Sequence, residues 1–305
     1  MKTRLALGAL TLLLAAPAWA GPLLYDGFEY PAGASLDDQV NVQYGLTWKH
    51  GGTTVSPTIA SGSLDSAAFG MPPAVGNRVA MIGRPATTTA NDADRIDIPT
   101  APSAGTLYWS GFIHVDGIST LAPASFLSGL LLGGFNNRPS SNTAVPSTGG
   151  ALLLIRQSAD GLHWNVGTGA TTVNTDRVFA TGGALDLDPG ATAFVVASYT
   201  WIDGTNNDLV KLWVNPSPGD LGAAVAPAET VSVAAVNAAS EALRADQGGA
   251  ASFFLRNNAS TVGAAETMHF DELRIGLEWA DVTPEPSVIG LLSLGMLLLP
   301  RRRRA

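Results

Sequence analysis

The fold is decided by a stretch in the middle of the chain, TAFVVASYTWI-DGTNND-LVKLWVN, which runs from Thr192 to Asn215. Two alternating runs, Thr192–Ile202 and Leu209–Asn215, flank six turn-forming residues, Asp203–Asp208. A period of two places apolar side chains on one face of a strand, and Asp, Asn and Gly satisfy the geometry of turns. The stretch therefore predicts two antiparallel strands joined as a hairpin.

Similar runs recur on both sides of this hairpin. Thr106–Val115 is the clearest of them, with Trp109 and Ile113 on one face and Tyr108 and Phe112 on the other. Further strand-like runs are Leu23–Phe28, Gly45–His50, Arg78–Ile82, Asp94–Ile98, Phe126–Leu132, Ala151–Gln157, Leu162–Val166, Ser252–Arg256 and Met268–Ile275. Strands that follow one another without helices between them predict an all-β fold, an antiparallel two-sheet sandwich.

The composition agrees with such a fold. The chain of 305 residues has 34 glycines and 19 prolines but only 14% charged residues, which favours strands and tight turns over helices. Within the body, Val236–Ala245 is the only segment that suits a helix. Because there is no cysteine, disulfides, thiol chemistry and cysteine-bound metals are excluded. A body spanning residues 21–282 is long enough to form a single sandwich domain.

The amino terminus predicts export. Lys2 and Arg4 precede the apolar run Leu5–Leu14, and small residues follow at Ala18 and Ala20. Basic residues, a short apolar run and small residues at the −3 and −1 positions are the parts of a secretory signal peptide. We expect residues 1–20 to be this peptide, with cleavage after Ala20. The alternative is an uncleaved anchor, for which the run is short.

The carboxyl-terminal part, residues 283–305, consists of three blocks. They are Pro284, Glu285 and Pro286, then the apolar run Val288–Pro300, and then Arg301, Arg302, Arg303 and Arg304. Two prolines around a glutamate force an extended break. The apolar run would partition into a membrane, although it is shorter than the ~20 residues of a comfortable helical span. Arginines after such a run are retained on the cytoplasmic side. A simple tail anchor is the alternative, but it does not require Pro-Glu-Pro.

These blocks, in this order, closely resemble the PEP-CTERM sorting signal, which exosortase-type membrane transpeptidases recognise and process. The resemblance implies that Pro284, Glu285 and Pro286 form the recognition element, that the apolar run forms a hydrophobic sorting helix, and that the arginines are the membrane stop. It also implies a partner, the exosortase-type enzyme. The protein would be anchored transiently in the inner membrane through this segment alone, and would then reach the cell surface or the extracellular space.

The net charge of the body argues against two further classes of partner. The chain has 17 basic and 25 acidic residues, and the two terminal segments contain six of the basic ones but only Glu285 of the acidic ones. The body therefore keeps 11 basic and 24 acidic residues. A body that acidic repels nucleic-acid phosphates and anionic membrane surfaces, so we expect neither as its partner.

Three segments of the body carry a second resemblance. They are Tyr25–Phe28, Leu212–Pro216 and Phe270–Gly276. These segments are similar to ones in the concanavalin A-like, laminin-G-like jelly rolls that are common ahead of sorting tails. Since they lie near both ends and in the middle of the body, the resemblance implies an antiparallel jelly roll over the whole body.

Catalytic patterns are missing. Glycoside hydrolases of this fold class need two carboxylates that flank the scissile bond, in the pattern Glu-x-Asp-x-x-Glu, and the chain lacks it. Asp92 and Asp94 could share a face, but we expect them in a loop after Asn91, while Asp271 and Glu272 would point to opposite faces of a regular strand. The four histidines are scattered. We therefore predict a protein that is not an enzyme, with a divergent glycoside hydrolase as an alternative.

Calcium is the one cofactor for which the sequence offers ligands. Asp203, Asn206 and Asp208 place oxygen atoms in one loop. The same residue types also occur simply because they form turns, and the turn is the default interpretation.

Carbohydrate binding needs an exposed aromatic surface. Tyr199 and Trp201 share a strand face, and Trp164 lies in another strand. Aromatic rings stack on sugars with the same flat apolar area that fills cores, so a core role is the alternative for each of them.

Together, the two terminal segments and the missing catalytic pairs predict an exported structural or adhesive protein of the cell surface or matrix, associated with exopolysaccharide. A carbohydrate-binding module is the second hypothesis.

Overall fold

The computed structural model describes residues 21–52, 56–82, 92–119, 121, 124, 129–144, 146, 149–171, 177–204, 207–234, 246–257 and 267–285. The predicted signal peptide, the predicted helix Val236–Ala245 and the apolar run Val288–Pro300 lie outside these residues. Within them, no helix has the length and apolar character needed to cross a bilayer.

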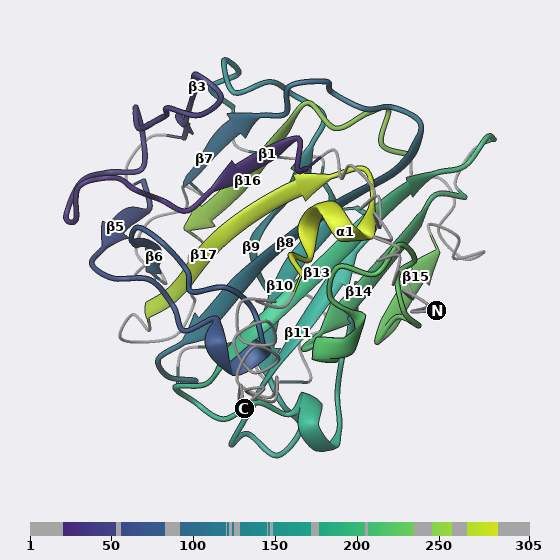
Figure 1. The fold of residues 1–305 in the computed structure, drawn as a ribbon. Coiled ribbons are helices and arrows are strands. Elements are labelled where there is room, and N and C mark those ends of the chain that lie inside the picture. Colours follow the sequence, from purple (N-terminus) through teal and green to yellow (C-terminus); the bar gives the residue numbers. More distant parts are fainter. Residues whose placement is uncertain are drawn as a thin grey trace, which may run out of the picture.

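The described residues form two large antiparallel sheets packed face to face (Figure 1). The first sheet has eight strands, which are, from one edge to the other, β15 (Val231–Ala234), β14 (Leu209–Val214), β13 (Thr192–Trp201), β8 (Gly105–Val115), β17 (Thr267–Gly276), β6 (Arg78–Ile82) and β5 (Thr58–Ala60), with β1 (Leu24–Asp26) also paired to β17. The second sheet has seven strands, β12 (Arg177–Phe179), β11 (Trp164–Gly169), β10 (Gly150–Gln157), β9 (Leu130–Asn136), β16 (Ser252–Asn257), β7 (Asp92–Asp97) and β4 (Lys49–Gly51).

The remaining elements are small. They are a two-stranded sheet of β2 (Val40–Asn41) and β3 (Leu46–Thr47), the 3₁₀ turns η1 (Ala67–Phe69), η3 (Gly183–Leu185) and η4 (Pro218–Asp220), and the helix α1 (Trp279–Val282). The prediction of an all-β, antiparallel, two-sheet sandwich is confirmed in the described part of the chain.

The central hairpin is also confirmed. β13 and β14 pair antiparallel, with Val195 opposite Val214 and Thr200 opposite Leu209. On its other side β13 pairs along its whole length with β8, from Thr192 opposite His114. The hairpin and β8 therefore form the middle of the eight-stranded sheet.

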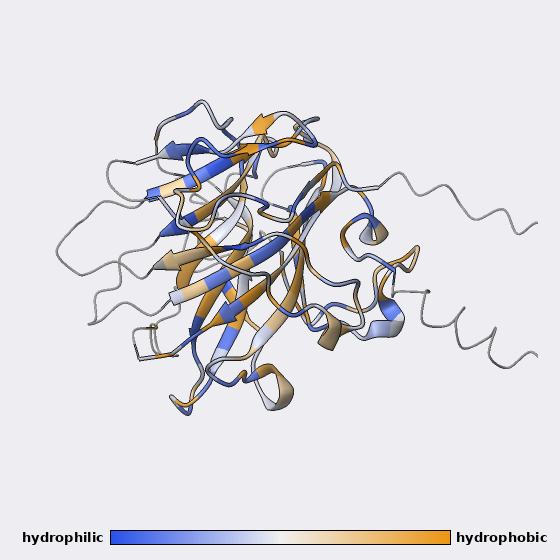
Figure 2. Cartoon of the chain, turned by 60° about the vertical axis from the view of Figure 1, so that its left-hand side comes forward, coloured by the Kyte–Doolittle hydropathy of each residue, from blue (hydrophilic) through white to orange (hydrophobic). Residues whose placement is uncertain are grey.

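The core lies between the two sheets. Trp109 and Ile113 on β8 are fully buried in it, as their alternation with Tyr108 and Phe112 predicts. The Trp109 indole donates a hydrogen bond to the carbonyl oxygen of Ala151, 2.7 Å away on the opposite sheet. Hydrophobic and hydrophilic positions alternate along the strands (Figure 2), which is the pattern that assigns one face of each sheet to this core.

Candidate functional site

The outer face of the eight-stranded sheet has a covered end. Residues 61–76, the segment after η4 and the helix α1 pack on it, and Figure 1 shows α1 lying in front of β8 and β13. A second apolar cluster forms beneath them from Leu64, Met71, Phe112, Phe194, Val196, Trp213, Leu221, Trp279 and Val282. This apolar contact explains why Phe112 and Phe194, which point away from the main core, are only 2% exposed.

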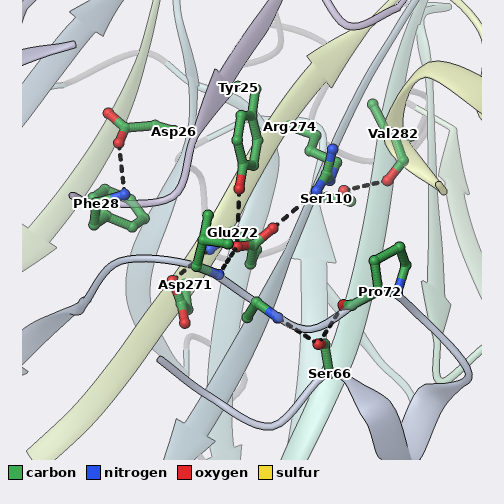
Figure 3. Close-up of polar contacts among 12 residues, drawn as sticks. Tyr25, Asp26, Phe28, Ser66, Pro72, Ser110, Asp271, Glu272, Arg274 and Val282 are labelled. Atoms are coloured by element: carbon green, nitrogen blue, oxygen red, sulfur yellow. Dashed lines mark hydrogen bonds and ion pairs between the residues drawn. The ribbon is translucent and has the colours of Figure 1, made fainter. Parts of the chain in front are cut away.

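Hydrogen bonds with the sheet and with η4 hold α1 in place. The Ser110 hydroxyl on β8 donates to the carbonyl oxygen of Val282 at 2.6 Å (Figure 3), and the Trp279 indole donates to the carbonyl of Asp220 at 2.8 Å. The Thr283 hydroxyl caps the helix by donating to the Trp279 carbonyl, 2.8 Å away. Thr283 is fully buried, so the folded body extends at least one residue beyond the predicted boundary at Val282.

The other end of the same face is open. A groove of about 870 Å³ lies there, and its lining comes from β8, β13, β14 and two covering segments. The lining residues are Thr106, Tyr108, Ser198, Thr200, Leu209, Lys211, Trp213, Ala224, Val225, Ala226, Pro227, Leu277, Glu278 and Trp279. A volume of this order falls within the range of small-molecule and sugar sites.

The strand register arranges the floor of the groove in rows. Tyr108, Ser198 and Lys211 stand side by side on three neighbouring strands, because Ser198 is the direct partner of both others. The next row on the same face, about 7 Å further along the strands, contains Thr106, Thr200 and Leu209. The floor thus combines hydroxyl groups and one ammonium group with one leucine side chain.

The polar groups of the floor differ in how they are bonded. The hydroxyls of Thr106 and Thr200 lie 2.9 Å apart and share a hydrogen bond. Lys211 forms an ion pair with Glu229 at 3.2 Å. The Ser198 hydroxyl is buried, and no hydrogen-bond partner for it exists among the described residues. Burial raises the pKa of Tyr108, so its hydroxyl keeps the proton and can donate it.

Aromatic rings close the groove at the covered end. The ring of Trp213 lies 6.1 Å from Tyr108 and 5.0 Å from Trp279. At the rim, Val225 and Leu277 are 79% and 48% exposed. A polar floor with an apolar rim and the partly exposed ring of Tyr108 can bind a ligand that has hydroxyl groups and flat apolar faces, as sugars do.

The aromatic residues predicted to contact sugar lie elsewhere. Trp164 is fully buried, and its indole donates to the carbonyl of Asp188. Tyr199 is fully buried too, with its ring 4.9 Å from Trp201, which packs against the main core. The core alternative is therefore the one that the structure shows for Trp164 and Tyr199. Trp201 shares a strand face with Tyr199 but is only partly buried, and it lines a second groove of about 490 Å³ beside Asp203 and Gln247.

The predicted calcium loop is built as a turn. Asp208 is buried, and its two carboxylate oxygens accept hydrogen bonds from the Tyr199 hydroxyl and from the backbone amide of Ile202. Asp203 is exposed in the turn, and Asn206 lies outside the described residues. In the described part of the chain no three His, Asp or Glu side chains gather closely enough to hold a metal ion.

The first predicted pair of carboxylates lies in a strand, not in a loop. Asp92 and Asp94 belong to β7, where pairing with β4 and β16 buries both completely, so the loop prediction is wrong. The Nδ1 atom of His50 lies 2.8 Å from an Asp94 oxygen and 2.9 Å from the Ser56 hydroxyl. The other ring nitrogen, Nε2, lies 3.7 Å from an Asp92 oxygen, so His50 bridges the two buried carboxylates of this strand.

The second pair departs from a regular strand. β17 has a bulge after Asp271, and Glu272 has a φ of 56°. Both carboxylates therefore reach the covering segment on one side of the sheet, and the prediction of opposite faces is wrong (Figure 3). Asp271 accepts the amide of Leu64 at 2.7 Å, and Glu272 accepts that of Val75 at 2.9 Å.

Both of these carboxylates are occupied by the fold. Glu272 also accepts the Tyr25 hydroxyl at 3.0 Å and pairs with Arg274 at 2.9 Å. Burial raises the pKa of Asp271 to about 8, and the hydrogen bond from the Leu64 amide offsets part of that rise. The pair anchors residues 61–76 to the sheet, since each acid accepts one backbone amide of that segment.

The chain leaves the body beside the covered end. Pro284 and Glu285 are the last described residues, and the Glu285 side chain is exposed. Pro286, Arg301, Arg302, Arg303 and Arg304 lie outside the described residues, as do Ala18 and Ala20.

Comparisons with known proteins add little to this geometry. No protein-family model matches the chain, and no curated protein matches its sequence. Similar solved structures include a carbohydrate esterase of a Shiga toxin-encoding bacteriophage, at 12% identity over 83% of this chain and 97% of that chain, with a TM-score of 0.43. The cellulose-induced protein Cip1 is similar at 14% identity over 83% and 97%, with a TM-score of 0.42. A β-1,3-glucanase from Mycobacterium marinum is similar at 13% identity over 84% and 100%, with a TM-score of 0.40. At these scores the likenesses assign neither a family nor an activity.

Proposed function

We propose that this protein is an exported β-sandwich that binds polysaccharide in the groove of its eight-stranded sheet and does not cleave it. The observation that carries the proposal is the groove itself, which combines the hydroxyls of Tyr108, Thr106 and Thr200 with the partly exposed ring of Tyr108 and the apolar rim at Val225 and Leu277. Groups of these two kinds bind the hydroxyls and the flat faces of sugars. The body is then a binding or adhesive module, of the concanavalin A-like jelly-roll type that its sequence resembles.

The absence of catalysis is part of the proposal. Glu278 is the acid of the groove lining, and its side chain caps α1 by accepting the amide of Asp281. Glu229 is paired with Lys211. The adjacent carboxylates Asp271 and Glu272 are bonded to the covering segment.

A substitution that fills the groove tests the binding site. Thr106→Arg places a long side chain over the floor, and the full-length protein should then lose its affinity for any polysaccharide that the wild type binds. Thr58→Arg, on the edge strand β5 of the same sheet, is the matched control and should bind normally. Affinity electrophoresis in gels that contain single polysaccharides measures both. Equal retardation of wild type and Thr106→Arg, or new reducing ends released by the wild type, would contradict the proposal.

The second part of the proposal concerns delivery. Residues 283–305 act as a PEP-CTERM-type sorting signal that an exosortase-type transpeptidase processes, so that the body reaches the cell surface or matrix and is associated with exopolysaccharide there. The exposed side chain of Glu285 beside the well-packed Thr283 supports this role, because a processing enzyme needs an accessible segment next to a folded body.

Fractionation of cells tests delivery. Glu285→Gln should leave unprocessed protein in the membrane fraction, whereas Glu29→Gln, a change at another exposed carboxylate, should be processed as the wild type is. Release of the Glu285→Gln protein at the wild-type rate would rule out the sorting role of this residue.

A further inference from the structure

Ser198 occupies the centre of the groove floor but is bonded to nothing there. It lies on β13 between Tyr108 and Lys211 and is 1% exposed, and its hydroxyl has no partner among the described residues. Ser110 on the neighbouring strand offers a direct contrast. It faces the same side and is equally buried, but its hydroxyl donates to Val282 at 2.6 Å.

An unpaired buried hydroxyl is unfavourable for the ligand-free protein. Water is lost when the group is buried, and no protein acceptor replaces it. An alanine at the same place would remove this cost. The Ser198 hydroxyl is therefore free to bond a partner that arrives through the groove that it lines.

The charges around the groove restrict what that partner can be. Lys211 is the one basic residue of the lining, and it is already paired with Glu229. A backbone hydrogen bond and Lys211 lower the pKa of Glu229, so this acid stays ionised. Glu278 is the one acid of the lining itself. Counted together with Glu229, the site has two acids and one base, and it belongs to an acidic body, so a polymer of uronic acids is repelled.

We propose that the ligand is an uncharged polysaccharide and that Ser198 is a residue that determines its affinity, through a hydrogen bond between the Ser198 hydroxyl and a ring hydroxyl of the sugar. This inference rests on the proposed function. The neighbouring hydroxyls of Tyr108, Thr106 and Thr200 offer further donors and acceptors within about 7 Å, the distance between rows on one face of a sheet. A pyranose unit with several hydroxyls matches such a surface.

The test measures binding and stability together. Full-length wild type and Ser198→Ala are titrated calorimetrically with neutral hexasaccharides of glucose, mannose and galactose, and with a hexamer of galacturonate. We expect one of the neutral sugars to bind, the galacturonate hexamer not to bind, and Ser198→Ala to bind about ten-fold more weakly or worse. Its melting temperature should equal or exceed that of the wild type, which a merely structural hydroxyl would not produce.

Thr168→Val is the matched control. Thr168 is fully buried on β11 of the other sheet, and its hydroxyl also lacks a partner among the described residues. This variant should keep wild-type affinity. Ser198→Cys, which keeps the size of the side chain but bonds weakly, should resemble Ser198→Ala.

The outcomes separate the two proposals. Unchanged affinity of Ser198→Ala, together with binding that Thr106→Arg abolishes, overturns the role of Ser198 and leaves the groove as the binding site. Binding of galacturonate in preference to the neutral sugars overturns the inference about charge. If the wild type binds none of the sugars, both the proposed function and this inference fail.

Discussion

The two ends of the outer face of the eight-stranded sheet differ in whether other segments cover their side chains. At the covered end, Phe194 and Val196 of β13 lie under α1 and form an apolar cluster. At the open end, Ser198 and Thr200 of the same strand form the floor of a groove. The backbone is continuous between them, so the difference comes from the side chains and from the segments they attract. A single strand can thus build both a second core and a binding surface. The apolar part of its outer face packs against the covering segments, and the polar part stays uncovered.

The largest effect is expected from removing the apolar anchor of the cover. Trp279→Ala should lower the free energy of unfolding by about 3–5 kcal/mol, because a large buried side chain is replaced by a cavity. Trp279 is 2% exposed and packs 5.0 Å from Trp213. Chemical denaturation followed by tryptophan fluorescence and circular dichroism measures the change. Leu162→Ala, at a side chain that is 67% exposed, is the control and should change stability by less than about 0.5 kcal/mol. A similar small loss in Trp279→Ala would mean that α1 does not stabilise the covered end.

A smaller loss is expected from Ser110→Ala. The substitution leaves the buried carbonyl of Val282 without its donor, which should cost about 1–3 kcal/mol. Ser198→Ala, on the same face, should cost nothing or stabilise the protein. Thermal unfolding of the two variants side by side gives the sign of each change. Equal destabilisation in both would remove the distinction between a hydroxyl used by the fold and one kept for a ligand.

A third effect is a change in pH dependence at the anchor of residues 61–76. Burial raises the pKa of Asp271 to about 8, above its ordinary value of 3.8, so the folded protein favours the protonated acid. The groups that face it are the amides of Leu64 and Glu272, the Glu272 carboxylate and Arg78. The stability that this proton confers is present below the ordinary pKa and is lost as pH rises towards about 8.

Asp271→Asn removes this titration. The melting temperature of the variant, measured relative to that of the wild type between about pH 5 and pH 9, should therefore rise with pH. Asp203→Asn, at an exposed carboxylate, is the control and should track the wild type across the range. A constant difference between Asp271→Asn and wild type would show that Asp271 does not hold a proton in the fold.

Local patterns in the sequence were sufficient for the sandwich. Alternation along Thr192–Trp201 and Leu209–Val214 predicted the hairpin that the structure has, and alternation along β8 predicted the buried side of Trp109. The inner face could have been recognised from the same pattern, since Tyr199 and Trp201 follow Val195 and Ala197 at every second position. That series identifies Tyr199 as a core residue and places Trp201 on the same face.

The groove and the cover depend on contacts that no local pattern contains. Ser110 and Val282 are 172 residues apart in the chain, and Leu64 and Asp271 are 207 residues apart. The bulge at Glu272, which turns both acids to one side, interrupts the alternation that a sequence analysis assumes. One signal of the groove was nevertheless present, because the outer positions of β13 change from Phe194 and Val196 to Ser198 and Thr200.

A crystal structure of the protein with the neutral hexasaccharide that binds it best tests the proposed sugar site most directly. We predict a sugar in the groove over β8, β13 and β14, with a ring hydroxyl within hydrogen-bond distance of the Ser198 Oγ atom. A sugar bound on the seven-stranded sheet, or one in the groove that leaves Ser198 without a partner, would contradict it.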